Sequence, residues 1–201
     1  MKNIITIQHT QAVHHCNGMI GSWTDWELTD LGKEQAKNIG RKLSVELKGH
    51  DYQIYSSDLI RAKQTAEPLA RHMGVGIEYF KNLREHNLGD AVGKSKQWAK
   101  ENELPVNSFD DQQFPGAESW REFWTRVSNV FHDIIDDDAK NIILVSHGGT
   151  LAVLQQIWLG LDIQDCKFGR AGSVSFMEIN SKGERSITRI NDMSYTEEVM
   201  M

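Results

Sequence analysis

Two short apolar runs constrain the fold of this chain most strongly. Residues 3–7 read Asn-Ile-Ile-Thr-Ile, and residues 141–146 read Asn-Ile-Ile-Leu-Val-Ser. Short runs that are apolar throughout, rather than alternating with polar residues, are typical of strands buried on both faces of a sheet. His9 follows the first run and His147 follows the second. Two histidines are therefore expected at the ends of two core strands.

Helical periodicity separates these strands from one another. Thr29 is a suitable N-cap for the first helix, and Pro68 is expected to kink or interrupt the second. A short apolar helix follows His147. The patterns predict helices over about 30–47, 59–73, 120–134 and 150–159, strands over 52–55 and 77–80, and a hairpin of 173–179 with 186–190.

This alternation of strands and helices predicts an α/β fold, a three-layer sandwich with a mostly parallel central sheet. We expect residues 1–201 to form a single domain. Ligands of such sheets bind outside the carboxyl ends of the strands. His9 and His147 should therefore meet at one edge of the sheet, where they are candidates for the functional site.

Residues 86–117, which we call the excursion, differ from the rest of the chain. They are punctuated by glycine and proline and contain one short helical pattern at about 95–101. Long excursions of this kind in compact domains often cover binding sites. We expect this one to cover the pocket and to carry most of the substrate specificity.

Charge and composition exclude several classes of function. The formal net charge of −6 disfavours nucleic acid and anionic membranes as partners. The amino-terminal residues do not resemble a signal peptide. Two cysteines, Cys16 and Cys166, are too few for a disulfide framework, so both are expected to be thiols in the cytoplasm. The oligomeric state is left open by these observations.

The residues at the predicted sheet edge suit phosphoryl transfer. A neutral imidazole is a nucleophile near pH 7, and charge that develops on a phosphoryl group needs fixed cations around it. Arg61, one turn into the second helix, can supply such a charge through its bidentate fork. The leaving oxygen needs a proton, for which Glu85 and Glu118 are the available carboxylic acids. Glu118 is also explained as a helix-start carboxylate and is left out of the catalytic set.

Six segments in order resemble the histidine phosphatase superfamily, the phosphoglycerate mutase-like proteins. The resemblance extends from residue 3 to about residue 193. It includes the segments that carry the second arginine, the acid and the second histidine of that family. The matching segments are Leu28-Thr29 with Gly32 and Gln35-Ala36, Ser56 to Glu67, Leu83-Arg84-Glu85 with Gly89 and Gly93, Pro115 to Ser119, Val145 to Gly149, and Ile190-Asn191-Asp192.

This resemblance implies hydrolysis of a phosphomonoester of a small phosphorylated metabolite, without metal or other cofactor. His9 would be the phosphorylated nucleophile. Arg61 and His147 would bind the phosphoryl group, and Glu85 would protonate the leaving group and then activate water. The resemblance also implies phosphate contacts from Gln8, Asn17, Ser22 and Gly148.

One departure from the family pattern bears on activity. Gln8-His9-Thr10 stands where the family has Arg-His-Gly, so one charged contact to phosphate is missing. A catalytically weakened or inactive phospho-ligand-binding protein is therefore an alternative. A phosphoglycerate mutase-type phosphotransferase is another, although the compact chain favours a phosphatase. His14 and His15 are interpreted as loop structure or phosphate contacts rather than metal ligands, because adjacent residues rarely bind one ion together.

Overall fold

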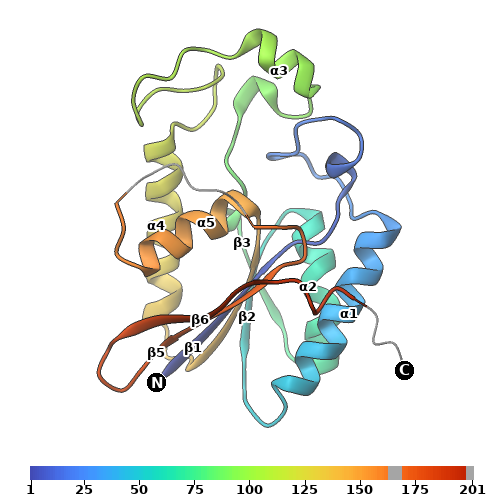
Figure 1. Cartoon of the computed structure of the whole chain (residues 1–201), viewed down its shortest axis with the longest axis vertical. Coiled ribbons are helices and arrows are strands. Elements are labelled where there is room, and N and C mark those ends of the chain that lie inside the picture. Colours follow the sequence, from blue (N-terminus) through green and yellow to red (C-terminus); the bar gives the residue numbers. More distant parts are fainter. Residues whose placement is uncertain (163–168, 198–201) are drawn as a thin grey trace.

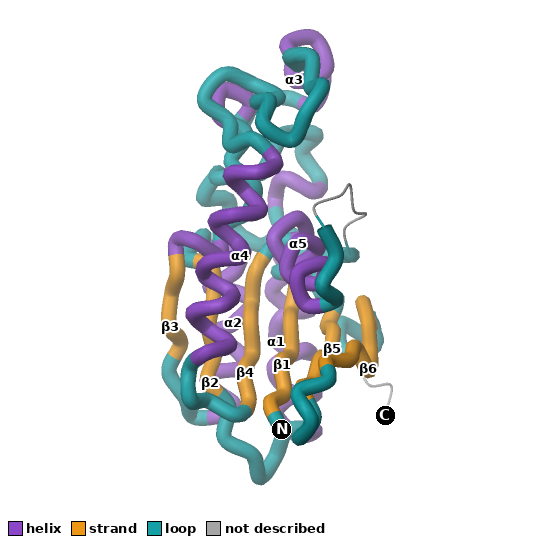
Figure 2. The backbone as a smooth tube through the Cα atoms, turned by 90° about the vertical axis from the view of Figure 1, so that its left-hand side faces the viewer, coloured by secondary structure: helices purple, strands orange, loops and turns teal. Residues whose placement is uncertain are grey.

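The computed structural model describes residues 1–162 and 169–197, so Cys166 lies outside the described residues. Six strands form one sheet in the order β3-β2-β4-β1-β5-β6 (Figure 2). Five α-helices accompany the sheet within these residues (Figure 1). The strands are β1 (Lys2–Gln8), β2 (Gln53–Ser57), β3 (Ile77–Phe80), β4 (Asn141–Ser146), β5 (Val174–Ile179) and β6 (Arg185–Asp192), and the helices are α1 (Asp30–Glu46), α2 (Ile60–Met73), α3 (Lys96–Asn102), α4 (Trp120–Asp136) and α5 (Gly148–Trp158).

The sheet is mostly parallel, as the alternating pattern predicts. β1 pairs in parallel with β4, from Asn3 opposite Asn141 to Gln8 opposite Ser146. β2 pairs in parallel with both β4 and β3, whereas β5 is antiparallel to β1 and to β6. The carboxyl ends of β1 and β4 consequently lie side by side.

Helices cover both faces of the sheet, which confirms the three-layer sandwich. Strand alternation places Ile5 and Ile7 in an apolar cluster with residues of α1 and α2. Ile4 belongs to a second cluster, on the opposite face, that includes buried residues of α4 and α5. The helix α4 begins at the predicted position because Ser119 and Glu122 form a capping box.

Pro68 was expected to kink or interrupt the second helix, and the interruption is wrong, because α2 continues through it to Met73. Pro68 is buried where α2 packs closely against α1. A Cβ atom built on Gly40 of α1 would lie 2.8 Å from the carbonyl carbon of Pro68 and from the amide nitrogen of Leu69. We attribute the intact helix to this close packing, which offsets the hydrogen bond that proline cannot donate.

The excursion stands beyond the carboxyl ends of the strands (Figures 1 and 2). An isolated bridge between Leu88 and Ala117 joins its two ends. A second bridge joins Ser95 to Met19, in the segment that follows β1. The excursion is therefore attached to the segment after His9. No helix in the described part of the chain is long and apolar enough to cross a membrane.

The close approach of α1 to α2 leads to a prediction for Gly40→Ala. Alanine favours a helix by about 1 kcal/mol over glycine, yet the added methyl group must displace the backbone of α2. We expect a net loss of about 1–3 kcal/mol in the free energy of unfolding, measured by urea denaturation. Gly76→Ala is the control, because no heavy atom of the residues described lies within 4 Å of its Cβ position. Equal stabilities for the two variants would contradict this explanation.

Candidate active site

His9 lies directly after β1 with one defined tautomer. Its Nδ1 is 2.8 Å from the carbonyl oxygen of Thr10, and its Nε2 is 3.3 Å from Nε of Arg61. A guanidinium can only donate, so Nε2 of His9 is the acceptor and Nδ1 carries the proton. The lone pair of Nε2 therefore points toward the charged end of Arg61. This is the protonation state that a nucleophilic imidazole requires.

Arg61 is buried at the amino-terminal end of α2, with only 1% of its surface exposed. Its Nη1 donates to the carbonyl oxygen of Thr24 and its Nη2 to that of Ser22, both at 2.7 Å. With the contact to His9, these bonds use three of the five guanidinium N–H groups. Two N–H donors without a partner in the described part of the chain, and a full positive charge, are left for an anion. Burial lowers the pKa of Arg61 to about 10, so it stays charged at neutral pH.

His147 follows β4 and lies beside His9, with 5.1 Å between the ring centroids. Its Nε2 is 2.8 Å from Oγ of Ser57, a hydroxyl that accepts from the amide of Leu59. The serine proton can therefore point to Nε2, which leaves the imidazole proton on Nδ1. This Nδ1 is buried and has no hydrogen-bond partner among the described residues.

Glu85 reaches the same edge from the segment after β3. Its two carboxyl oxygens accept from the amides of His86 and Gly149, each at 2.9 Å. A Cβ atom at Gly149 would lie 2.3 Å from Oε1 of Glu85, so only glycine leaves room for this carboxyl group. The glycine pair after His147 thus allows the carboxyl group to lie against the start of α5.

Arg126 of α4 holds the segment that carries Glu85, and sequence reasoning missed it. It pairs with both carboxyl oxygens of Glu118, at 2.6 and 2.7 Å. It also donates to the carbonyl oxygens of Asn82, Arg84 and Glu85. Glu118 is therefore a partner of Arg126, which agrees with leaving it out of the catalytic set. Its position on a half-buried face of α4 is the signal by which the sequence could have identified Arg126 as a structural residue of the site.

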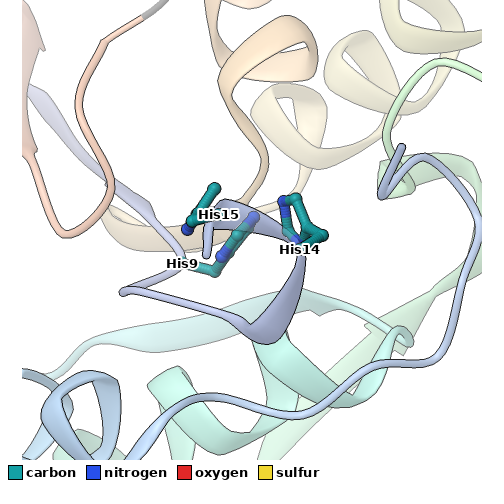
Figure 3. A group of neighbouring side chains, drawn as sticks. All are labelled: His9, His14 and His15. Carbon is teal, nitrogen blue, oxygen red and sulfur yellow. The ribbon is translucent and has the colours of Figure 1, made fainter. Parts of the chain in front are cut away.

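His14 and His15 lie against His9 in a cluster of three imidazoles (Figure 3). The His9 and His15 rings are stacked at 5.4 Å, and the His9 and His14 centroids are 5.6 Å apart. One nitrogen from each residue lies within 4.8 Å of the others, so the cluster has the donor type of a metal site. Both nitrogens of His9 are engaged by Thr10 and Arg61, however, and the arginine charge opposes a cation.

A cavity of about 540 Å³ lies beside this cluster. His14 and His15 line it, together with Ser22, Glu85 and Gly149. His9 is only 3% exposed and is not among the lining residues. The excursion contributes further wall residues, including Lys96 and Val106.

The four remaining residues predicted to contact phosphate differ in how close they lie to the cavity. Ser22 lines the cavity, but its hydroxyl donates to the carbonyl oxygen of His86. Gly148 is the buried first residue of α5. Gln8 is nearly buried, and strand alternation places it with Ile4 on the α4–α5 face. Asn17 is exposed, and its side-chain oxygen accepts from the amide of Met19.

Thr10 uses its hydroxyl group to fix the segment after β1. The hydroxyl donates to the carbonyl oxygen of Gly32 in α1, at 2.8 Å. The amide of Thr10 donates to Oγ1 of Thr65 in α2. Of the two roles that its position allows, constraint of the loop and replacement of a lost donor, the structure favours the first.

Burial keeps the clustered histidines neutral. The pKa values of His9 and His147 lie well below the usual 6.5, first because of burial and then because of the charge of Arg61. Burial also lowers the pKa of His14 to about 3, with His15 and Arg61 as lesser causes. The site therefore combines one buried cation with neutral imidazoles, an arrangement suited to an anion that a nucleophilic nitrogen attacks.

Comparison with known proteins shows which family and which relatives this chain resembles. The model of the histidine phosphatase superfamily (branch 1) matches residues 4–193. A Hydrogenobacter thermophilus protein named as a phosphoserine phosphatase is 26% identical over 99% of this chain and 100% of its own length. A Salmonella choleraesuis protein named as a probable phosphoglycerate mutase is 30% identical over 80% of this chain and 76% of its own length.

Solved structures share the fold. The α-ribazole phosphatase from Shigella flexneri superposes with a TM-score of 0.82 at 20% identity, covering 95% of this chain and 96% of its own. A mycobacterial glucosyl-3-phosphoglycerate phosphatase gives 0.79 at 21% identity, covering 95% and 99%. The phosphoglycerate mutase-like α/β architecture is thus shared over nearly the whole length of these proteins.

The neutral histidines make stability depend on pH. The folded-state pKa values of His9 and His147 lie below the unfolded value, so acidification protonates the unfolded chain first. Stability should therefore fall as the pH drops from about 7 to 5, by up to about 2 kcal/mol for each of these two residues. Urea denaturation at both pH values measures the slope, and His9→Gln should reduce it. An unchanged slope in His9→Gln would show that folded His9 accepts a proton.

Proposed function

This chain belongs to the histidine phosphatase superfamily, and on that basis we propose that it hydrolyses a phosphomonoester of a small metabolite through a phosphohistidine at His9. The observation that carries the proposal is the convergence of four groups. Nε2 of His9 faces Arg61, His147 packs against His9, and the Glu85 carboxyl group adjoins the helix that follows His147.

In the first step, the phosphoryl group is bound by cationic and neutral donors. Arg61 offers its two unused N–H groups, and His147 offers its unpartnered Nδ1. Nε2 of His9 then forms a bond to phosphorus while the bond from phosphorus to the ester oxygen breaks. Glu85 gives its proton to the leaving oxygen, and the alcohol departs. Because His14 lines the cavity in front of His9, its ring must move aside for this attack.

In the second step, water completes the hydrolysis. The Glu85 carboxylate takes a proton from a water molecule as the water oxygen bonds to phosphorus. The bond between phosphorus and Nε2 of His9 breaks, inorganic phosphate leaves, and both residues return to their first states. No metal is needed, because the positive charge comes from Arg61.

The compact chain favours a phosphatase over a mutase. A mutase must keep water from the phosphohistidine while its substrate turns around. Longer inserts over the site would exclude that water. We further propose that the enzyme acts in the cytoplasm, in keeping with its low cysteine content.

A binding protein without catalysis is the second candidate. Gln8 replaces the family arginine, and His9 is covered by His14 and His15. Both features favour a site that holds a phosphorylated ligand without converting it.

Activity on an aryl phosphate, with EDTA present, tests the proposed function directly. We expect turnover by the wild type that falls at least about a thousandfold in His9→Ala, because the covalent route is lost. Quenching of the wild type with detergent at alkaline pH during turnover of ³²P-labelled substrate should trap label at His9 that is stable to alkali and released by acid. Wild-type activity equal to that of His9→Ala would instead support the binding protein.

Vanadate binding tests the consequence of Gln8. Charge-assisted hydrogen bonds are roughly twice as strong as neutral ones, so Gln8→Arg should tighten vanadate binding by about tenfold or more. Inhibition constants for wild type, Gln8→Arg and His14→Ala provide the measurement. No gain in Gln8→Arg, together with a large loss in His14→Ala, would show that His14 has taken over the missing contact.

A further inference from the structure

The cavity beside the cluster has an apolar wall with an aromatic platform. Trp120 and Phe123, from the start of α4, both pack against His86: each ring lies nearly parallel to that of His86, at interplanar angles of 18° and 14°. Burial lowers the pKa of His86, so this ring is neutral. The rest of the apolar wall comes from the segment after β1 and from the excursion: Met19, Ile20, Leu88 and Val106.

The charged side chains of the cavity are mostly acidic. Four carboxyl groups of the described residues line it, those of Glu85, Glu103, Asp111 and Glu118, with one ammonium group, that of Lys96. Arg126 neutralises Glu118, and Glu85 is protonated when substrate binds in the proposed reaction. Glu103 and Asp111 remain against Lys96, so a substrate carboxylate in this space meets more repulsion than attraction.

Neither nearby cation is well placed to bind a second anionic group. Lys96 lines the cavity together with His14 and His15, and its backbone amide donates to the carbonyl oxygen of Gly18, in the segment that follows these histidines, so Lys96 lies on the histidine side of the cavity. Arg126 is paired with both oxygens of Glu118 and donates to three carbonyl oxygens. Beyond the phosphate, the cavity therefore offers apolar contact and negative charge.

We propose that the substrate is the phosphomonoester of an apolar alcohol or phenol whose leaving group carries no carboxylate. This inference rests on the proposed function. It separates the chain from relatives named for phosphoserine or phosphoglycerate, because both of those compounds carry a carboxylate.

Matched pairs of esters test the substrate class. Glycerol 3-phosphate and 3-phosphoglycerate differ chiefly by a carboxylate, as do phosphoethanolamine and phosphoserine. In each pair, kcat/KM of the purified wild type should be higher for the ester without the carboxylate, by about tenfold. 3-Phenylpropyl phosphate should exceed glycerol 3-phosphate by a similar factor, since burial of the phenyl group is favourable.

A cation added to the wall should reverse the discrimination. Val106→Arg places a guanidinium on the cavity, and Leu104→Arg adds the same charge to a neighbouring exposed position outside it. We expect Val106→Arg to raise kcat/KM for 3-phosphoglycerate relative to glycerol 3-phosphate by about tenfold, with little change in Leu104→Arg. Both side chains are exposed, so neither change should disturb folding.

The outcomes separate this inference from the proposed function. Turnover with a preference for the carboxylate in either pair, or equal shifts in the two arginine variants, overturns the substrate class alone. Turnover no higher than that of His9→Ala overturns the proposed phosphatase. In that case, calorimetry measures the dissociation constants of 3-phenylpropylphosphonate and 3-phosphonopropionate. Tighter binding of 3-phosphonopropionate, which carries a carboxylate, overturns the inferred ligand class.

Discussion

Because β1 and β4 are adjacent and parallel, the residues that follow them emerge side by side at one edge of the sheet. This pairing brings His9 and His147 to a centroid distance of 5.1 Å, although they are far apart in sequence. The same edge receives Arg61 from the start of α2 and Glu85 from the segment after β3. The rest of the candidate site is arranged around these two strand ends, as expected for the carboxyl edge of a parallel sheet.

Arg61 connects the structure of this edge with its chemistry. A buried guanidinium needs partners for its N–H groups, and the carbonyl oxygens of Ser22 and Thr24 supply two of them. Those bonds also fix the segment that follows His9. The same charge, added to burial, keeps His9 and His147 in their neutral forms. One residue thus orders the loop and adds to the effect of burial in keeping His9 unprotonated, and in the proposed reaction it would also bind the anion.

Residues outside the cluster determine what the site can accept. The pairing of Arg126 with Glu118 holds the segment of Glu85 and leaves little of the arginine charge for a ligand. The excursion closes over the same region and contributes both apolar and acidic wall residues, including Val106 and Glu103. In the proposed reaction, the phosphoryl group would bind beside Arg61, and the leaving group would face these apolar and acidic wall residues.

The sequence by itself determined the layers of the fold and the edge at which His9, Arg61 and His147 meet, whereas Glu85 was assigned to that edge by the resemblance of its segment to the histidine phosphatase superfamily. Strand and helix periodicities are local, and the order of parallel strands then fixes where their ends lie. Only the tertiary structure decided that His14 lines the cavity in place of His9, since that depends on how a loop packs on a sheet edge. The intact path of α2 through its proline and the engagement of Arg126 with Glu118 are likewise contacts between distant segments. Such contacts depend on close packing in three dimensions, which no local pattern of residues encodes.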